Sequence, residues 1–468
     1  MGFKSLFEKE FGFPLTNNQR ELVEALDWFL FHQNQTNIFL LKGYAGTGKT
    51  SIIATLVGLL PQYNLRSLLM APTGRAAKVL AQYANKQAYT CHKYLYFSYR
   101  DEEGNHRFVP RKPKRKNTVF IVDEASMISD SSMDSSLFSN NLLEDIINHV
   151  ERSVDSKLIL IGDNAQLPPI GMEESPALDA DYLGRRFGIN PFEFLLWEVV
   201  RQSLDSGVLR NASNIRYSIT KPRLRYPYFK PNDHDFIRIE PSEIEYALRD
   251  EYSSRGIDEV VVITRTNKLA NLFNNHIRYR ILDRENEIEA GDHIICVKNN
   301  YFWLSHNNYS GFIANGDILY VKRIISYHEV YGVKYADIIV SLPDYPDIED
   351  MELRVNLSTL NSDSPSMTRD EFMSIYNQIS VDYSHIKNKT ERNKAIREDE
   401  FYNALQVKFS YTLTAHKAQG GQWEAVFLEQ GYYIEEMHNI EYLRWLYTAI
   451  TRAKTKLYLC NFQEEFFV

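Results

Sequence analysis

Residues 36–59 read TNIFLLKGYAGTGKTSIIATLVGL and combine three features in a fixed order. A short apolar run at 36–42 predicts a buried strand, residues 43–50 match G-x-x-x-x-G-K-T, and the apolar positions that follow recur at helical spacing. This order of strand, loop and helix is the context that separates a phosphate loop from a chance glycine-rich turn. The stretch predicts an α/β domain that binds nucleotide phosphates.

Each part of the loop at residues 43–50 has a predicted role. The glycines let backbone N–H groups approach the phosphates, and the following helix adds the positive end of its dipole. Lys49 is predicted to neutralise the β- and γ-phosphates, and Thr50 to ligate Mg²⁺. We therefore expect ATP and Mg²⁺ as cofactors. The predicted loop ligands are Gly43, Ala45, Gly46, Thr47, Gly48, Lys49 and Thr50.

Short apolar runs alternate with amphipathic helices beyond the loop as well. Runs at 67–71, 119–122 and 157–161, and a later one at 260–264, each precede a helical pattern. Such alternation favours parallel sheets covered by helices on both faces. The sequence therefore predicts an α/β protein with two such domains.

A different pattern interrupts the second α/β domain. Alternating short strands with Gly-Asp turns predict a small antiparallel barrel or sheet, and a charged, helix-like stretch at 368–404 follows it. We expect the first domain at 1–205 and the second at 206–289 and 406–468. The inserted barrel with its charged stretch then occupies 290–405.

Composition and charge exclude several classes of protein. The 53 Lys and Arg against 61 Asp and Glu give a net charge of −8, so any nucleic-acid contact must be local, as in the basic segment at 107–116. No apolar run approaches the roughly 18 residues of a membrane span, and the first residues lack a secretory pattern, so we expect a cytoplasmic protein with no membrane partner. Cys91, Cys296 and Cys460 are too widely spaced for a zinc site or a disulfide framework, and we expect reduced packing residues.

Two carboxylates follow the predicted strand at 119–122. Asp123 is placed to reach the magnesium shell, and Glu124 to polarise the attacking water. An acidic pair at a strand end is by itself more often a solvated strand end or a helix cap. The phosphate loop upstream favours the catalytic interpretation.

Four further blocks stand in a fixed order along the chain: PTGRAA at 72–77, GDNAQLPPIG at 162–171, TAHKAQG at 414–420 and YTAITRAK at 447–454. Together with the phosphate loop they resemble the motifs of superfamily 1 helicases, and most closely those of the RecD and Dda branch. This resemblance implies an ATP-driven DNA motor with two RecA-like domains that moves 5′ to 3′ on single strands. We expect a small barrel inserted into the second domain and a β-hairpin pin in the first.

The resemblance also implies roles for individual residues. Gln19 resembles the glutamine that reads the adenine edge, and Gln166 resembles the sensor of the γ-phosphate. Arg201 and Arg452 resemble the arginines that approach the γ-phosphate from the second domain, although a surface salt bridge is the alternative for Arg201. We also expect Gly420 to be one of the nucleotide-binding residues.

The predicted DNA contacts include residues of the blocks at 72–77 and 414–420, together with residues outside these blocks. Hydroxyl, amide and imidazole groups can bond phosphates without reading bases, which suits a motor that passes over any sequence. A histidine on a loop is more often structural, but His92 and His416 have counterparts in the family. The predicted set is Pro72, Thr73, Thr90, His92, Phe108, Asn267, Thr414, His416 and Lys417.

Residues 97–117 are predicted to form the β-hairpin that acts as a pin at the duplex fork. Aromatic residues are placed to stack on bases and the basic residues to meet phosphates, while the alternative is a solvated basic loop. The stretch at 368–404 is either a helical arm that contacts the pin or a spacer with no further role.

The sequence thus predicts a monomeric, ATP- and Mg²⁺-dependent 5′ to 3′ DNA helicase acting on single-stranded and forked duplex DNA in repair, recombination or replication. Repair or replication proteins are candidate partners. The competing hypothesis is a nucleotide-switched DNA-binding subunit of a repair complex that does not unwind. The set Lys49, Glu124, Gln166 and Arg452 favours turnover.

Overall fold

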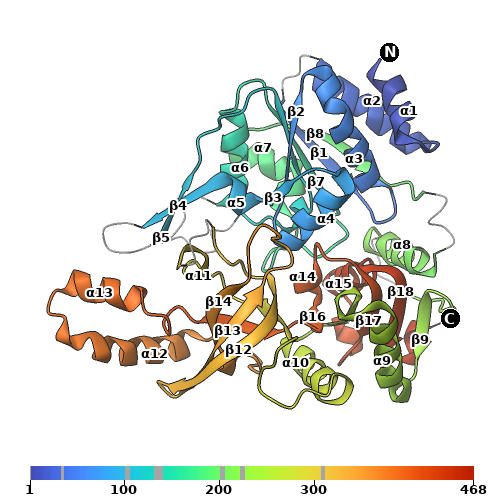
Figure 1. Cartoon of the computed structure of the whole chain (residues 1–468). Coiled ribbons are helices and arrows are strands. Elements are labelled where there is room, and N and C mark those ends of the chain that lie inside the picture. Colours follow the sequence, from blue (N-terminus) through green and yellow to red (C-terminus); the bar gives the residue numbers. More distant parts are fainter. Residues whose placement is uncertain are drawn as a thin grey trace.

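The computed structural model describes residues 2–32, 36–100, 106–130, 141–200, 206–221, 227–306 and 311–467. Two α/β domains face each other, and a barrel with a helical arm lies beside the second (Figure 1). The β4–β5 hairpin of the first domain and the arm project toward the same side.

The first domain contains a parallel sheet in the order β3-β2-β6-β7-β1-β8. Alternate residues of β1 face opposite sides of this sheet: Phe39 and Leu41 pack with α1, α2 and α3, whereas Ile38 and Leu40 pack with α5 and α6. The apolar runs predicted as strands are confirmed as β1, β2, β6 and β7. The strands are β1 (Ile38–Gly43), β2 (Arg66–Ala71), β3 (Ala88–Thr90), β6 (Thr118–Val122), β7 (Lys157–Gly162) and β8 (Phe192–Leu196), and the helices are α1 (Phe3–Phe11), α2 (Asn17–Phe31), α3 (Lys49–Leu59), α4 (Gly74–Ala84), α5 (Cys91–Leu95), α6 (Leu142–Glu151) and α7 (Ala180–Phe187).

The second domain contains a parallel sheet in the order β16-β10-β17-β18-β9. Its core joins α8 and α15 to one face of the sheet through residues such as Ile215, Leu428 and Leu446. The predicted pair of RecA-like domains is thus confirmed. The elements are α8 (Gly207–Ile219), β9 (Phe236–Ile239), α9 (Ile244–Arg255), β10 (Val260–Thr264), α10 (Asn267–His276), β16 (Thr412–Thr414), α14 (Ala415–Ala418), β17 (Trp423–Glu429), α15 (Ile440–Ile450) and β18 (Ala453–Cys460).

A closed barrel is inserted between β10 and β16. Its strands are β11 (His293–Cys296), β12 (Ile318–Val330), β13 (Val333–Ser341), β14 (Met351–Asn356) and β15 (Leu405–Phe409), and a short helix, α11 (Trp303–His306), follows β11. β15 pairs with both β11 and β14, which closes the barrel. The barrel therefore extends through β15, and the predicted boundary at 405 falls too early.

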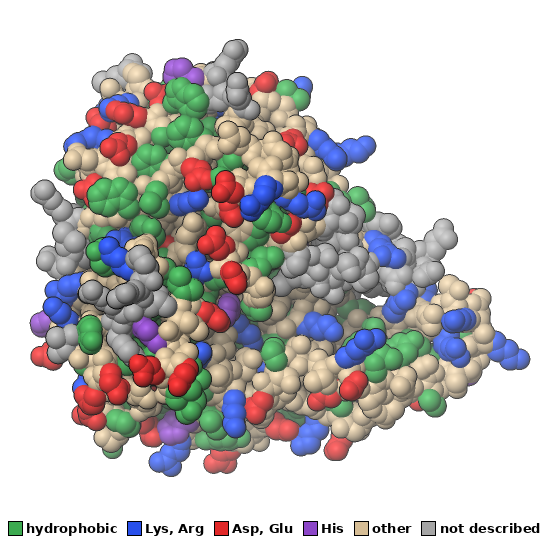
Figure 2. Space-filling view, turned by 180° about the vertical axis from the view of Figure 1, so that it is seen from behind, with side chains coloured by type: hydrophobic (Ala, Val, Ile, Leu, Met, Phe, Trp, Pro, Cys, Tyr) green, Lys and Arg blue, Asp and Glu red, His purple; other side chains and the backbone are tan. Residues whose placement is uncertain are grey.

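Two projections leave this framework. β4 (Tyr96–Arg100) and β5 (His106–Pro110) form an antiparallel hairpin, and α12 (Arg369–Asp382) with α13 (Lys389–Arg397) forms the arm. The arm has its own small core of Ile375, Ile379 and Ile396. Figure 2 shows Lys and Arg side chains gathered on the arm.

The described residues contain no helix long and apolar enough to cross a membrane. Cys91, Cys296 and Cys460 are free and buried, as predicted.

Candidate active site

The phosphate loop joins β1 to α3 and uses glycine where the backbone turns to positive φ. Gly46 has φ +75° and Gly48, which caps α3, has φ +83°. A Cβ atom at Gly48 would lie 2.8 Å from Gln19 Nε2, so the loop and the N-terminus of α2 approach each other closely. The motif therefore folds as the strand, loop and helix that the sequence predicts.

The Lys49 side chain folds back onto the first two residues of the loop. Its ammonium donates hydrogen bonds to the carbonyl oxygens of Gly43 (2.5 Å) and Tyr44 (2.8 Å). Thr47 is buried and its hydroxyl also donates to Tyr44 O, at 2.8 Å. The carbonyl oxygens at the start of the loop thus hold the Lys49 ammonium in place.

Gln19 is buried against the same loop. Its Nε2 donates to Thr47 O at 3.0 Å, and its Oε1 accepts from Thr16 N–H at 3.0 Å in a capping box that begins α2. Both ends of the amide are hydrogen-bonded within the protein. Recognition of adenine by Gln19 stays a prediction.

Asp123 and Glu124 lie where β6 ends, next to the phosphate loop. Asp123 Oδ1 accepts the Glu124 N–H at 2.8 Å, and Glu124 adopts the left-handed conformation with φ +52°. Burial, and then the charge of Glu124, raise the pKa of Asp123 to about 6, while Lys49 opposes this shift. Two crowded carboxylates form a site that favours a bound cation.

This donor set fits Mg²⁺. Among the described residues, no group of three or more His, Cys, Asp or Glu side chains could hold a metal. Mg²⁺ is usually held by one or two protein oxygens together with substrate phosphates, so Thr50 and Asp123 are the residues that would hold it. Bound there, the ion would neutralise charge on the phosphates.

Arg452 brings a positive charge from the second domain to this site. Its Nη1 lies 3.9 Å from Glu124 Oε1, and the buried guanidinium also donates to Thr448 O and Gly421 O, at 3.0 and 3.2 Å.

Gln166 lies in the turn that follows β7 and is buried. Its Oε1 has no hydrogen-bond partner in the part of the chain described. An orphaned acceptor of this kind is available to a water or ligand donor.

The two domains also meet through hydrogen bonds that sequence reasoning missed. The Tyr447 hydroxyl bonds Ala45 N–H and Asp163, Thr448 Oγ1 accepts from Leu167 N–H at 2.8 Å, and Gln419 Nε2 donates to Leu167 O at 2.7 Å. Tyr447 and Asp163 stand inside blocks quoted above. Only the tertiary contact distinguishes them from their neighbours.

Gly420 packs against the first domain. It has φ +73°, and a Cβ atom there would lie 2.9 Å from Ala76 Cβ and 3.2 Å from Thr73 Oγ1. This close approach explains why a glycine ends the block at 414–420. Arg201, the other predicted arginine, lies outside the described residues, but Val200 just before it donates its N–H to Gly46 O at 3.0 Å.

The predicted DNA contacts of the first domain gather at a second place, between this domain and the barrel. A cavity of about 480 Å³ lies between α4, the second domain and the barrel. A separate cavity of about 250 Å³ is lined by Pro72, Thr90, His92 and Phe108, among others. Thr73 and Thr90 cap α4 and α5 by accepting backbone N–H groups. We call the 250 Å³ cavity and its lining the strand track, after the DNA contact that stays a prediction for these residues.

The strand track is lined by aromatic side chains together with polar ones such as Lys93 and Arg111. Phe108 is 4% exposed and packs on Tyr301 and Phe312, with ring centroids 4.9 and 5.6 Å apart. The expectation that Phe108 is presented to bases is therefore wrong for this arrangement, and Phe97, 54% exposed, is the outward aromatic of the hairpin. Burial lowers the pKa of His92 to about 4, so its imidazole is neutral near pH 7.

The predicted DNA contacts of the second domain lie at the carboxyl ends of neighbouring strands. Thr264 pairs with Thr414, which brings Asn267 at the start of α10 toward the segment 414–417. Burial lowers the pKa of His416, and burial lowers that of Lys417 to about 8. Contact of these residues with DNA stays a prediction.

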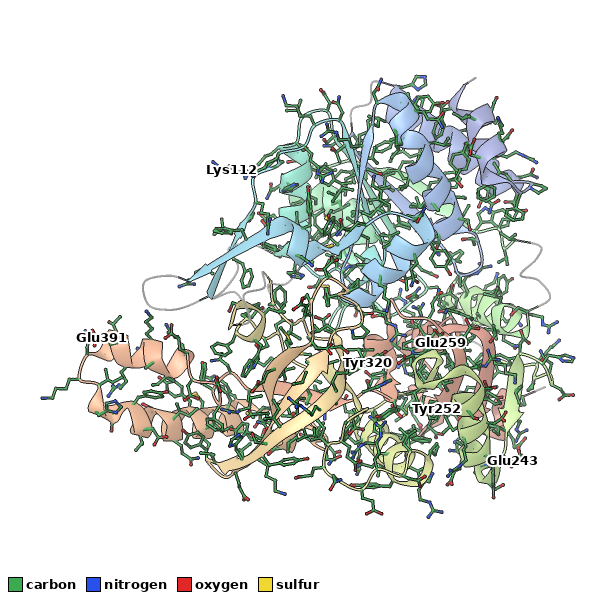
Figure 3. The ribbon with its side chains drawn as sticks, viewed as in Figure 1. Lys112, Glu243, Tyr252, Glu259, Tyr320 and Glu391 are labelled. Atoms are coloured by element: carbon green, nitrogen blue, oxygen red, sulfur yellow. The ribbon has the colours of Figure 1, made fainter. Side chains whose placement is uncertain are left out.

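The basic segment at 111–116 is not part of the hairpin, because β5 ends at Pro110. Its main chain is held along α6: Ser153 Oγ donates to Arg115 O at 2.8 Å, and a ring nitrogen of His149 lies 3.1 Å from Arg111 O. Its basic side chains are exposed, and Figure 3 shows Lys112 pointing away from the first domain. The strands of the hairpin therefore end short of the predicted bound at 117, although the Arg111 N–H still donates to Leu95 O at 2.6 Å, and action as a pin stays a prediction.

Two family models match the chain. The model described as "AAA domain" matches residues 30–172, and the one described as "UvrD-like helicase C-terminal domain" matches residues 409–460. The first match contains the phosphate loop and the Asp123–Glu124 pair, and the second contains Arg452.

Similar proteins cover the chain to different extents. The chain is 24% identical to the uncharacterized protein R530 of Acanthamoeba polyphaga mimivirus, over 94% of this chain and 99% of R530. It is 29% identical to the ATP-dependent RecD2 DNA helicase of Deinococcus radiodurans, over 32% of this chain and 18% of RecD2. It is 25% identical to the ATP-dependent DNA helicase dda of Enterobacteria phage T4, over 54% of this chain and 55% of that protein.

Among solved structures, a Pif1 helicase from Bacteroides in complex with ADP-AlF3 and single-stranded DNA aligns with 97% of this chain and 95% of its own. The sequence identity is 15% and the TM-score is 0.47.

Proposed function

The chain is a superfamily 1 helicase of the RecD and Dda type, and on this premise we propose that it hydrolyses ATP to move 5′ to 3′ along single-stranded DNA and to unwind a forked duplex. We propose Mg²⁺ as the accompanying ion, held by Thr50 and Asp123.

The observation that carries this proposal is the approach of Arg452 to Glu124 across the domain interface, at 3.9 Å. Arg452 and the acidic pair belong to different domains, so the distance between them changes when the domains move. The rate of hydrolysis can therefore depend on the relative position of the two domains. An arginine in such a position stabilises charge on the phosphoryl oxygens of the transition state. Closing and opening of the interface can then drive movement along a strand.

The strand track supports DNA as the substrate. Neutral His92, capping Thr90 and aromatic rings offer hydrogen bonds and stacking surfaces that do not depend on base sequence. The hairpin beside this track is the proposed pin, with Phe97 rather than Phe108 as the residue that meets bases at the fork.

The test is strand displacement from duplexes that carry either a 5′ or a 3′ single-stranded tail. We expect ATP-dependent displacement from the 5′-tailed duplex, and none from the 3′-tailed duplex or with Lys49→Ala. Displacement from the 3′-tailed duplex alone would reverse the polarity. DNA-stimulated hydrolysis without displacement from either substrate would instead support a nucleotide-switched binding subunit.

A further inference from the structure

One hydroxyl group connects the phosphate loop to the turn at 163–167. Tyr447 Oη accepts a hydrogen bond from Ala45 N–H at 2.9 Å and donates its proton to Asp163 Oδ2 at 2.7 Å. The tyrosine belongs to α15 of the second domain and is 1% exposed. It therefore contacts two segments of the nucleotide site from across the domain interface.

The Tyr447 hydroxyl forms one hydrogen bond with each of its two partners, as an acceptor for Ala45 N–H and as a donor to Asp163. Burial, and then the charge of Asp163, raise the pKa of Tyr447 well above its usual value, so the phenol stays a neutral donor. Asp163 is also buried, and its other oxygen accepts from Ala165 N–H at 2.9 Å. A hydrogen bond to a buried carboxylate is charge-assisted, and its removal leaves a costly unsatisfied group.

Neighbouring contacts across the interface differ from this one. In the described part of the chain, the side chains of Thr448 and Gln419 form hydrogen bonds across the interface with Leu167 and none with the phosphate loop. Tyr447 bonds both the turn and the loop. Its hydroxyl therefore sets the distance between them.

The same helix also carries Arg452. Tyr447 O accepts the Thr451 N–H at 3.0 Å, and Arg452 Nε donates to Thr448 O at 3.0 Å. The guanidinium beside Glu124 is thus fixed to the helical turn that holds the phosphate loop. A shift of the loop relative to Tyr447 becomes a shift relative to Arg452.

We propose that Tyr447 is a positioning residue for ATP hydrolysis, which holds the phosphate loop, the turn that carries Gln166, and Arg452 in one geometry. This inference rests on the proposed function. A misplacement of reacting groups by about 1 Å can cost about 100-fold in rate. The hydroxyl acts through these groups and does not itself take part in phosphoryl transfer.

The first test compares Tyr447→Phe with Tyr442→Phe. Both tyrosines lie on α15 and are 1% exposed, but the Tyr442 hydroxyl accepts from Gln430, at 3.1 Å, within the second domain. In saturating single-stranded DNA, we expect Tyr447→Phe to lower kcat about 10- to 100-fold and to change KM for ATP by less than about threefold. Tyr442→Phe should keep parental kinetics.

Active-site concentration, measured by titration with a fluorescent ATP analogue, corrects each rate for protein that is not folded. A parental kcat for Tyr447→Phe, or an equal loss for both variants, would overturn the proposal.

A second test does not depend on turnover. Urea unfolding of Tyr447→Phe, Asp163→Ala and the double variant forms a double-mutant cycle. We expect the two changes to be clearly non-additive, because each removes the same hydrogen bond. If the parental chain shows no ATPase, the proposed function fails, but the cycle still measures the coupling between Tyr447 and Asp163. Additive effects would show that the two side chains are not coupled, and this would overturn the inference about Tyr447.

Discussion

The nucleotide site and the strand track differ in the kind of contact that joins their two sides. At the nucleotide site, Tyr447, Thr448 and Gln419 of the second domain form hydrogen bonds of 2.7–2.9 Å with the first. At the strand track, Phe108 and His92 meet Phe312 of the barrel through ring contacts with centroids 5.6 and 5.7 Å apart.

This difference matches what each place has to do. Hydrogen bonds are directional and fix positions closely, which hydrolysis requires. Apolar and aromatic contacts are far less directional, so these rings can shift against one another at little cost. Elsewhere between the first domain and the barrel, Lys78 donates to Pro343 O at 3.1 Å and lies 3.5 Å from Asp344 Oδ1. The ring contacts suit the proposed passage of a strand of any sequence.

The largest expected effect comes from removing the cation that crosses the nucleotide interface. Arg452→Ala should lower kcat for ATP about 1,000-fold or more, because arginines in this position stabilise transition-state charge. Arg249→Ala, on the exposed face of α9, is the matched control and should leave kcat unchanged. A kcat for Arg452→Ala within about twofold of the parent would break the assignment of this interface as catalytic.

Glu124→Gln should lower ATP turnover about 100- to 10,000-fold, the range that general acid–base catalysis supplies. ATP binding should survive, since Lys49 and the loop N–H groups are untouched. Binding is measured with a fluorescent ATP analogue and turnover in saturating single-stranded DNA. Parental turnover in this variant would show that Glu124 is not the base.

The hairpin offers a direct comparison between a buried and an exposed aromatic. Phe108→Ala should lower the free energy of unfolding by about 3–5 kcal/mol, because the ring is packed in the interior. Phe97→Ala should change stability by less than about 0.5 kcal/mol, as surface substitutions do, yet reduce strand displacement several-fold while ATPase persists.

Urea unfolding and strand displacement measure the two effects. Phe97 also lines the strand track, so loss of DNA-stimulated ATPase in Phe97→Ala would mean that it holds the strand and does not act as a pin. Unchanged displacement would mean that Phe97 has no role at the fork.

The smallest expected effect is a pH dependence of DNA binding. Burial lowers the pKa of Lys417 to about 8, so this ammonium loses its proton as the pH rises through 8 and its attraction to phosphate disappears. Affinity for single-stranded DNA should fall a few-fold between about pH 7 and 9, and Lys417→Arg should remove this dependence because arginine stays charged. An equal fall in Lys417→Arg would exclude Lys417 as the source.

Much of the fold follows from local pattern. Apolar runs such as 119–122 are buried strands because parallel strands are covered on both faces, and polar residues that follow them meet at one edge of the sheet. This is why Asp123 and Glu124 lie beside Lys49 as the sequence predicts. The hairpin and the helical arm also follow from turn residues and charge spacing.

Other features depend on residues far apart in the chain. The side of the hairpin that is buried is decided by Tyr301 and Phe312, which lie near the barrel and select Phe108 over Phe97. The barrel ends with β15 rather than at 405, because β11 needs a second partner. Local sequence periodicity predicts neither the buried face of the hairpin nor the last strand of the barrel.

The nucleotide site shows the same division. The sequence by itself determined the phosphate loop and the acidic pair, since the chemistry requires these residue types in this context. The resemblance to superfamily 1 helicases pointed to Arg452. The tertiary structure alone decided that Tyr447 bonds Ala45 and Asp163, because a tyrosine in a helix is equally suited to core packing. A hydroxyl becomes a positioning group only when the fold brings a buried donor and a buried acceptor to it from another domain.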